Sequence, residues 1–446
     1  MMAAPNILKG AEKGGSDTLH VALVGFGKQL GEALFPALKN IPGLYFQAVC
    51  DISEQRQTAY KSVSRGMPNA KDTKFYTDID DMLATEKGLD CAIIASPDFW
   101  HSEHTIKCLE AGLNVYCEKM MSNTIEGARA MVKAAEKSGK LCQIGHQRRS
   151  NPRYRYTFEQ LINGKKIAGQ ITNAQAQWNR SLNASQGIGG DAVNMKIMPS
   201  LEVLNKYGFE GKTHEEAVNR YLNWRLFRDL SGGPISDLGA HQIDIFNWFL
   251  EAVPKRVYAT GGKAYFKNRD HFDNVLCLFD YDTKYGEVRA FYQVLTTTSS
   301  GGGFWENFMG TEATIKTAEI AAQSAIYRES GAPKWDELVA KNYLQKKPVP
   351  NKPKDNAGAV AAYESPPPDE FILPGDMPMV TNSKGKAIPK PAHQPHLENF
   401  FASVRGEETL NCDARHAFES EAPIFWVNPS ALSQEPIDLT EEHLSV

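Results

Sequence analysis

Short apolar runs alternate with helical segments along the first third of the chain. The runs have the length and the Val, Ile and Cys content of buried strands, and helical spacing of apolar positions follows most of them. The expected strands cover residues 20–25, 45–50, 75–76, 90–95, 114–117 and 141–145, and the expected helices cover 54–63, 102–111 and 124–137. Strands that alternate with helices predict an α/β domain with a parallel sheet over residues 20–150.

After about residue 150 the pattern changes to consecutive strands. A helix is expected at 153–163, and a second helix at 236–250 interrupts the strands that follow. Those strands are expected at 171–178, 255–266, 275–281, 287–297 and 311–318. Consecutive strands with few helices predict an α+β domain with a mainly antiparallel sheet over residues 151–345.

The remaining segments lack such a pattern. Residues 1–19 read as a tail, and 182–223 as an insertion rich in Asn, Gly and Lys that we expect to form a flap. Residues 346–396 hold many of the prolines and predict a long arm or loop that wraps a neighbouring subunit. Residues 397–446 are expected to pack back on the two domains.

Charge and composition exclude several classes of protein. The net charge is −4 with no basic block, which argues against a nucleic-acid partner. No apolar run approaches the roughly 20 residues needed to span a membrane. The 7 cysteines are scattered without Cys-x-x-Cys spacing, so neither a disulfide framework nor a cysteine-based zinc site is expected.

The first residues bear on location in the cell. Residues 1–8 have no charged n-region or apolar h-region, yet they resemble the stub that remains after an export signal is removed. We therefore predict a cytoplasmic protein as the sequence stands, or a periplasmic one if a leader precedes Met1.

A glycine turn follows the first strand. Gly25 and Gly27 let the backbone turn tightly and approach a pyrophosphate at a helix N-terminus. The third glycine of the usual spacing is replaced by Leu30, with Gly31 one place late. Asp51 ends the second strand, where it would accept hydrogen bonds from ribose hydroxyls and repel a 2′-phosphate, so NAD is preferred to NADP. The candidate cofactor contacts here are Gly25, Phe26, Gly27, Gln29, Leu30 and Asp51.

Polar clusters also follow the later strands of the predicted parallel sheet. Ligands of such sheets bind outside the carboxyl ends of the strands, where loops carry function. The candidates for cofactor binding are Ser96, Pro97, Trp100, His101, Glu118, Lys119 and Gln147.

The helix at 236–250 carries an unusual polar stripe. It follows a Gly-Gly-Pro turn with Ser236 in the N-cap position, and Asp237, His241, Asp244 and Trp248 share one face. Two carboxylates and an imidazole on an otherwise apolar helix cost free energy unless they are paired or used in chemistry. Asp237 is also placed to contact His241 one turn later and raise its basicity. A capping Asp and a structural His are the alternative, but the whole stripe favours a site.

Three motifs together resemble the Gfo/Idh/MocA oxidoreductases, relatives of glucose-fructose oxidoreductase and inositol dehydrogenase. They are the glycine turn with Asp51, Ser-Pro-Asp-Phe-Trp-His at 96–101 leading to Glu-Lys-Met at 118–120, and Gly-Gly-Pro-Ile-Ser-Asp-Leu-Gly-Ala-His-Gln-Ile-Asp at 232–244. The resemblance covers about residues 20–320 and extends weakly to the end. It implies a Rossmann domain, a C-terminal domain whose open sheet often mediates oligomers, a nicotinamide cofactor and a sugar or cyclitol substrate. We therefore expect NAD and a homo-oligomer, a dimer or a tetramer.

The resemblance also assigns roles to three residues. Lys119 corresponds to the Lys of the family's Glu-Lys-Pro motif, beside nicotinamide and substrate. Asp237 corresponds to the substrate-contacting Asp, and His241 to the catalytic His. Met120 stands where the family commonly has Pro, which argues against a cis peptide at that position.

These residues suit the oxidation of a secondary alcohol. We expect His241 to take the hydroxyl proton, Lys119 to stabilise the developing alkoxide, and Asp237 to bind an adjacent hydroxyl or orient His241. Further candidates for substrate contact, each with a structural reading as well, are Arg148, Trp178 and Arg225. No metal is expected, because hydride chemistry explains the stripe and the sequence offers no clear further ligand.

Three functions remain open from the sequence. The first is an NAD-dependent dehydrogenase of a sugar, sugar derivative or glycoside. The second is a redox-neutral glycoside hydrolase, lyase or epimerase that recycles NAD in place through a keto-sugar. The third, a non-catalytic NAD sensor, is disfavoured because a sensor has no need of Lys119, Asp237 and His241 together.

Overall fold

The computed structural model describes residues 18–67, 69–181, 194–266, 270–299, 303–347, 368–374, 379–381 and 386–446. Most of the tail expected at 1–19, the first part of the expected flap and residues 348–367 of the expected arm lie outside the described residues.

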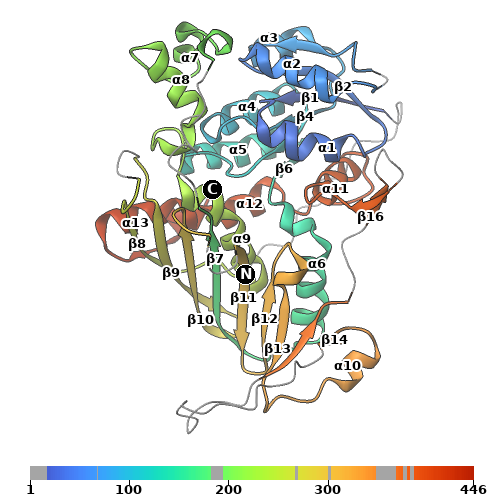
Figure 1. The fold of residues 1–446 in the computed structure, drawn as a ribbon, viewed down its shortest axis with the longest axis vertical. Coiled ribbons are helices and arrows are strands. Elements are labelled where there is room, and N and C mark those ends of the chain that lie inside the picture. The colour runs from blue at the N-terminus through green and yellow to red at the C-terminus, as the bar shows by residue number, and fades with distance from the viewer. Residues whose placement is uncertain are drawn as a thin grey trace.

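The first sheet is six-stranded and entirely parallel, with the order β3-β2-β1-β4-β5-β6 (Figure 1). Its strands are β1 Leu19–Val24, β2 Leu44–Cys50, β3 Lys74–Tyr76, β4 Cys91–Ile94, β5 Asn114–Cys117 and β6 Cys142–Ile144. The central strands β1 and β4 are buried on both faces, which is why they read as continuous apolar runs. The predicted Rossmann fold is confirmed, and the strand order reverses between β1 and β4, where ligands bind.

Helices cover both faces of this sheet. They are α1 Phe35–Leu38, α2 Glu54–Val63, α3 Ile79–Thr85, α4 Asp98–Glu110 and α5 Ile125–Ser138. Helix α4 begins at Asp98, four residues before the expected start at Ser102, because Pro97 already has the extended conformation of an N-cap. The motif residues Trp100 and His101 therefore lie on the first turn of a helix rather than in a loop. Among the described helices, none has the length and apolar composition needed to cross a membrane.

The large sheet contains ten of the described strands in the order β14-β15-β13-β12-β11-β7-β10-β9-β8-β18. Its strands are β7 Ile171–Asn179, β8 Arg256–Gly262, β9 Asn274–Thr283, β10 Gly286–Leu295, β11 Phe304–Gly310, β12 Ala313–Thr317, β13 Ala325–Arg328, β14 Gln345–Lys346, β15 Asp369–Ile372 and β18 Ile437–Asp438. Among the described strand pairs of this sheet, only β7 and β10 are parallel, and the other pairs are antiparallel. The prediction of a mainly antiparallel sheet is confirmed, although β11 and the edge strands beyond β12 were not predicted from the sequence.

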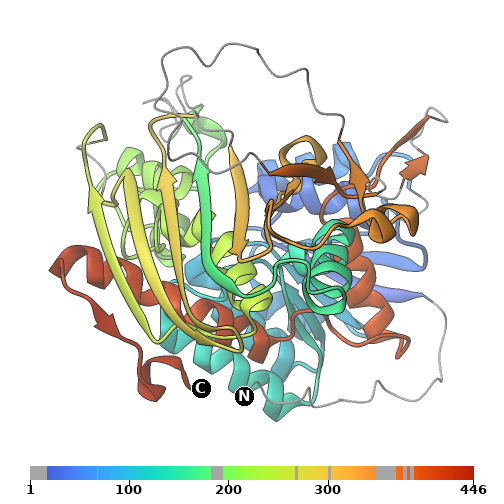
Figure 2. The same cartoon turned by 90° about the horizontal axis from the view of Figure 1, so that it is seen from below.

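Helices pack on one face of the large sheet, and none of the described elements covers the other face (Figure 2). Along β8 and β9, buried residues such as Val257 and Phe279 alternate with exposed ones such as Leu278, which is 48% exposed. Helix α9 Ala240–Leu250 packs against β7, β10 and β11 on the covered face. This places the start of α9 near the carboxyl edge of the first sheet.

The insertion before α9 contains two short helices, α7 Leu201–Lys206 and α8 His214–Leu222. They lie beside the first sheet rather than on the large one, across from α3 (Figure 1).

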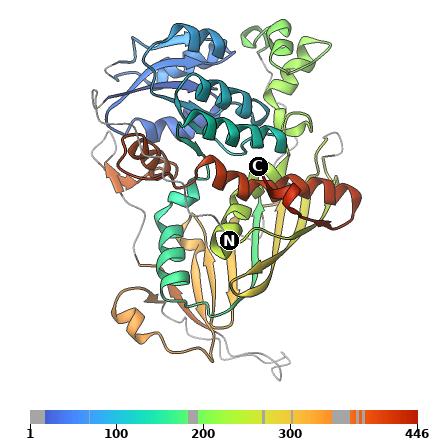
Figure 3. The ribbon, with the colours of Figure 1, turned by 180° about the vertical axis from the view of Figure 1, so that it is seen from behind.

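The C-terminal segment runs between the two sheets (Figure 3). It contains α11 Gln394–Val404, α12 Ala414–Glu421, α13 Val427–Ser433 and α14 Glu441–Leu444. The remaining α-helices and strands of the described residues are α6 Pro152–Tyr156, α10 Asp336–Ala340, β16 Met379–Thr381 and β17 Ala387–Pro389. Phe401 and Phe418 complete the two cores on either side of the first sheet, and Val427 joins the core of the large sheet. Strand β15, from the segment expected to form an arm, pairs with β13 of its own chain.

Candidate active site

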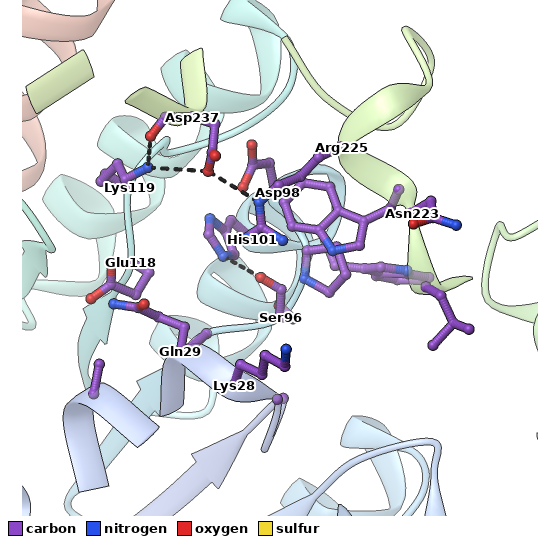
Figure 4. A pocket seen from close by; sticks show the side chains of 18 of the residues that line it. Lys28, Gln29, Ser96, Asp98, His101, Glu118, Lys119, Asn223, Arg225 and Asp237 are labelled. Carbon is purple, nitrogen blue, oxygen red and sulfur yellow. Dashed lines mark hydrogen bonds and ion pairs between the residues drawn. The ribbon is translucent and has the colours of Figure 1, made fainter. Parts of the chain in front are cut away.

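A cavity of about 1180 Å³ lies between the carboxyl edge of the first sheet and the start of α9. It exceeds the usual size of a pocket for one small ligand, so an extended cofactor and a second small molecule can share it. Its walls bring together most of the residues predicted from sequence (Figure 4). They are Gly25, Gly27, Gln29, Asp51, Ser96, Pro97, Trp100, His101, Glu118, Lys119, Gln147, Trp178, Arg225, Asp237 and His241.

The glycine turn presents backbone to the cavity. Gly25 has φ +77°, and a Cβ there would come within 2.5 Å of backbone at the end of β4. No atom lies within 4 Å of the Cβ position of Gly27, which leaves room for a ligand. The side chains of Phe26 and Leu30 are buried in the core under the sheet, so only their backbone is left to contact a cofactor as predicted. The late glycine, Gly31, gives space to the ring of Phe26, 3.3 Å from its Cβ position.

Asp51 is oriented at the end of β2 by the following turn. The backbone N–H of Ser53 donates to its Oδ1 at 2.9 Å. Burial raises the pKa of Asp51 to about 6, against the Ser53 hydrogen bond and the positive charge of Arg56, which both favour the carboxylate. The carboxyl group is therefore ionised at neutral pH and can accept hydrogen bonds from hydroxyl groups.

Lys119, Asp237 and Arg225 form an ion-pair cluster on the opposite wall (Figure 4). Lys119 Nζ donates to the backbone carbonyl of Asp237 at 2.5 Å and lies 3.7 Å from its Oδ1. Arg225 Nε donates to the same Oδ1 at 3.0 Å. Burial opposes the carboxylate, but Arg225 and Lys119 outweigh it and lower the pKa of Asp237 to about 2. The carboxylate of Asp237 therefore stays ionised across the physiological range.

The peptide between Lys119 and Met120 is cis, so the expectation drawn from Met120 is wrong. Tertiary contacts fix both sides of this peptide. The Met120 side chain is buried in the core of the large sheet, and the N–H of Met121 donates to Glu421 of α12 at 2.7 Å. A proline is not needed where such contacts define the chain path.

His241 lies on the first turn of α9, and both it and Trp178 line the cavity. The centroids of the two rings are 5.6 Å apart. Burial lowers its pKa well below the usual value, and the nearby charges of Lys119 and Arg148 lower it further. The imidazole is therefore neutral at pH 7 and able to accept a proton. Its Nδ1 is buried and makes no hydrogen bond within the described part of the chain.

The predicted contact between Asp237 and His241 is not formed, because the carboxylate of Asp237 is held by Arg225 and Lys119 instead. Residues Ile235–Gly239 form a π-helical turn rather than an α-helical one. The i, i+4 spacing of an α-helix therefore does not apply between the two residues. The helix also starts before Ser236, which is not its N-cap.

The rest of the predicted stripe is structural. Asp244 is 1% exposed and accepts hydrogen bonds from Arg149 at 2.8 Å and Ser420 at 2.7 Å. Trp248 packs against Phe158, with ring centroids 5.1 Å apart. Of the four residues of the stripe, only Asp237 and His241 line the cavity. No cluster suited to a metal ion occurs among the described residues.

The prediction that Arg148 contacts substrate is wrong, because this side chain lies behind the cavity wall and is 1% exposed. It pairs with Glu306, and its Nε donates to Glu319 at 2.6 Å. Its guanidinium lies 5.7 Å from the ring centre of Trp178 and 5.4 Å from that of Phe304. Arg148 thus supports the aromatic wall from behind.

The cavity also contains residues that sequence reasoning missed. Asp98, the first residue of α4, is buried in the wall, and burial raises its pKa to about 7 although Lys119 and Arg225 favour the carboxylate. Asp98 is part of the Ser-Pro-Asp-Phe-Trp-His motif at 96–101, so this motif could have indicated it as a site residue. His393 comes from the C-terminal segment, with Nε2 3.2 Å from the amide nitrogen of Gln29. Nothing in the local sequence marks it.

A Rossmann sheet that faces a second domain across such a cavity is the arrangement of a two-domain dinucleotide-binding protein. Residues 19–146 match the NAD-binding Rossmann domain of an oxidoreductase family, and residues 209–439 match the C-terminal alpha/beta domain of the same family. The chain belongs to the Gfo/Idh/MocA oxidoreductase family.

Individual relatives are distant. A 4-carboxy-2-hydroxymuconate-6-semialdehyde dehydrogenase from Sphingobium sp. is 30% identical over 165 residues, 37% of this chain and 50% of that protein. A 2,7-anhydro-N-acetylneuraminate hydratase from Mediterraneibacter gnavus is 25% identical over 250 residues, 55% of this chain and 53% of that protein. The chain spans about half the length of these curated relatives. The WlbA dehydrogenase from Bordetella pertussis, solved with NADH and UDP-GlcNAcA, shares the fold, with a TM-score of 0.62 and 16% identity over 95% of this chain and 99% of that one.

Proposed function

We propose that this protein is an NAD-dependent oxidoreductase that oxidises a secondary hydroxyl of a sugar, a sugar derivative or a glycoside. The observation that supports this most directly is the placement of His241, Lys119 and Asp237 on one wall of the cavity, opposite the glycine turn. The neutral imidazole, the ammonium group and the ionised carboxylate are the three groups that alcohol oxidation requires.

His241 acts as the general base in this proposal. Its lowered pKa keeps the ring neutral, so it can accept the hydroxyl proton near pH 7. Bound NAD supplies the acceptor for the hydride from the same carbon. Trp178 packs beside the imidazole and limits its rotation.

Lys119 holds the reacting oxygen as negative charge develops on it. Its ammonium group is anchored to the carbonyl of Asp237, so little reorganisation is needed during the reaction. Asp237 is ionised and held by Arg225, and it accepts a hydrogen bond from a neighbouring hydroxyl of the substrate. This pairing of roles favours a polyhydroxylated substrate.

The substrate class follows from the wall that faces these groups. The rings of Trp178 and Phe304 lie 4.6 Å apart and form an aromatic surface, while Arg225 and Asp237 offer hydrogen bonds beside it. An aromatic surface next to charged groups suits the apolar face and hydroxyl rim of a sugar ring. The names of the relatives, which include inositol and glucoside dehydrogenases, support a carbohydrate or cyclitol.

NAD is the proposed cofactor, with its pyrophosphate at Gly25 and Gly27 and a ribose at Asp51. The ionised Asp51 accepts ribose hydroxyls and repels a 2′-phosphate. The assembly of two or four chains remains a proposal based on the open face of the large sheet.

A redox-neutral reaction is the second candidate. One relative is named a hydratase, and hydration involves no net oxidation of its substrate. In such a cycle the hydride taken from one carbon is returned before the product leaves, so NAD is not consumed. Tyr207, Phe209 and Tyr221 of the insertion line the cavity beside Asp51, and this enclosure of the cofactor end favours the alternative.

A direct test mixes the dialysed protein with NAD and a panel of pyranosides and cyclitols and follows NADH absorbance. Steady NADH formation with one substrate supports the dehydrogenase. Substrate conversion without NADH formation, by a protein that keeps its NAD, supports the redox-neutral cycle instead.

The His241→Ala variant tests the assigned base. We expect turnover to fall at least about 100-fold, the usual scale for a general base. His20→Gln is the matched control. His20 lies on β1, its Nδ1 bonds Gln47 of β2, and the variant should keep full activity. Full activity of His241→Ala would refute the assignment.

A further inference from the structure

The insertion that carries α7 and α8 has a small core of its own, which extends onto the first domain. Helix α7 lies between the two ranges that match the family, 19–146 and 209–439. The core includes Leu204, Phe209, Ala217, Val218, Trp224 and Leu230. Ile52 and Phe99 of the first domain pack against it, and the rings of Phe99 and Phe209 meet edge to face at 5.4 Å. The insertion is therefore docked on the first domain rather than projecting into solvent.

Polar contacts secure the same docking. Tyr207 Oη donates to Asp78 Oδ2 at 2.8 Å, and Lys206 Nζ lies 3.0 Å from the same oxygen. Trp100 Nε1 donates to the backbone carbonyl of Tyr207 at 3.0 Å. Burial opposes the Asp78 carboxylate, but the Lys206 and Tyr207 hydrogen bonds outweigh it and lower its pKa to about 2. These contacts are thus formed throughout the neutral range.

The docked insertion faces one end of the cavity. Tyr207, Phe209 and Tyr221 line it together with Asp51 and Ile52. Tyr221 interacts with side chains beside Asp51, those of Arg56 and Ser53, and its ring meets that of Phe209 at 5.2 Å. Since the acidic residue at the end of β2 marks the ribose of the adenosine half, these aromatic rings face adenosine.

We propose that residues 206–222 form the outer wall of an adenosine subsite and retain NAD between turnovers. The proposal rests on the redox-neutral form of the proposed function, in which the hydride is returned to the substrate, and adds that the cofactor is resident. Release of NAD requires the insertion to leave the first domain, which breaks the Tyr207 and Lys206 contacts with Asp78 and separates the aromatic rings. The hydride taken from the substrate is returned to it within the same cycle, so NAD is regenerated in place and turnover does not need this opening.

The test measures how fast NADH leaves the protein, without any substrate. The holoprotein is loaded with NADH and mixed with excess NAD, and the loss of protein-to-NADH energy transfer gives the release rate. Tyr221→Ala removes the ring next to Asp51, and Tyr207→Phe removes only the Oη contacts with Asp78, Thr77 and Lys206. Tyr265→Phe, at an exposed tyrosine outside the insertion, is the control.

We expect slow release from the parent protein and the control. Both insertion variants should release NADH about tenfold faster or more, as expected for the loss of an aromatic or hydrogen-bonded contact. Fast release from the parent protein, or release that stays slow in both variants, overturns the proposal. Failure of the proposed function would give a different result: the protein would release NADH with these kinetics but would convert no carbohydrate.

Discussion

Replacement of Glu421 should have a large effect on both stability and activity. This residue ends α12 and is fully buried. Its Oε2 accepts the N–H of Met121 at 2.7 Å, and its Oε1 lies 2.8 Å from Nε2 of His146. Glu421 therefore ties the loop that carries Lys119 to the end of β6. Glu421→Leu fills the same volume but removes the acceptor from both donors.

The magnitude follows from the two groups left without a partner. A buried donor that loses its acceptor costs about 1–3 kcal/mol, so Glu421→Leu should lower the free energy of unfolding by about 2–6 kcal/mol. That is a large part of the roughly 5–15 kcal/mol typical of a folded protein. Glu421→Gln keeps an oxygen for Met121 and can donate to His146 in its other tautomer, whose Nδ1–H would face Asp244 at 3.7 Å. We expect it to cost no more than about 1 kcal/mol.

Urea unfolding followed by tryptophan fluorescence measures these differences. Glu419→Gln, at a partly exposed residue on the same helix, serves as the control. Turnover of Glu421→Leu at low temperature should fall about 100-fold, because Lys119 loses its fixed position, while NADH binding is kept. An unfolding midpoint equal to that of the parent protein would refute the reasoning, since the two buried donors would then have found other partners.

Three further outcomes are expected. Affinity for NAD, measured by calorimetry, should fall as the pH drops through about 6, where Asp51 becomes protonated and stops accepting ribose hydroxyls; Asp51→Asn should bind weakly with no such dependence. In an NMR titration of His241, Lys119→Met should raise the imidazole pKa, because one of the cations that lower it is gone; an unchanged titration would show that the Lys119 charge does not act on His241. Arg148→Met leaves Glu306 buried without its cation and should lower the free energy of unfolding by about 3–5 kcal/mol, measured in urea, and a variant as stable as the parent would contradict this.

Much of the fold was predictable because the decisive signals are local. Strands buried on both faces, such as β1 and β4, appear as short apolar runs, and the polar residue that follows each strand lies at the ligand edge of the sheet. That rule correctly brought Asp51, Lys119 and His101 to one cavity. The glycine turn and the site helix were likewise visible in single segments.

The remainder depended on partners that are distant along the chain. Spacing on an ideal helix grouped Asp244 with His241, but Arg149 and Ser420 hold Asp244 on the other side. The π-helical turn before α9 also changed the relation of Asp237 to His241. The local sequence does not show which distant side chain a residue will contact. The pairing of Arg148 with Glu306 and the contact of His393 with Gln29 therefore could not be predicted.

The bond between Met121 and Glu421 joins residues 300 positions apart, and this sets the order in which the molecule matures. On the ribosome the first sheet emerges well before α12, by roughly 15–60 s at usual rates of synthesis. During that interval the loop of Lys119 lacks its anchor, and the two cores beside the first sheet still lack Phe401 and Phe418. Competence for the reaction is therefore acquired last, once the C-terminal segment has packed between the two sheets.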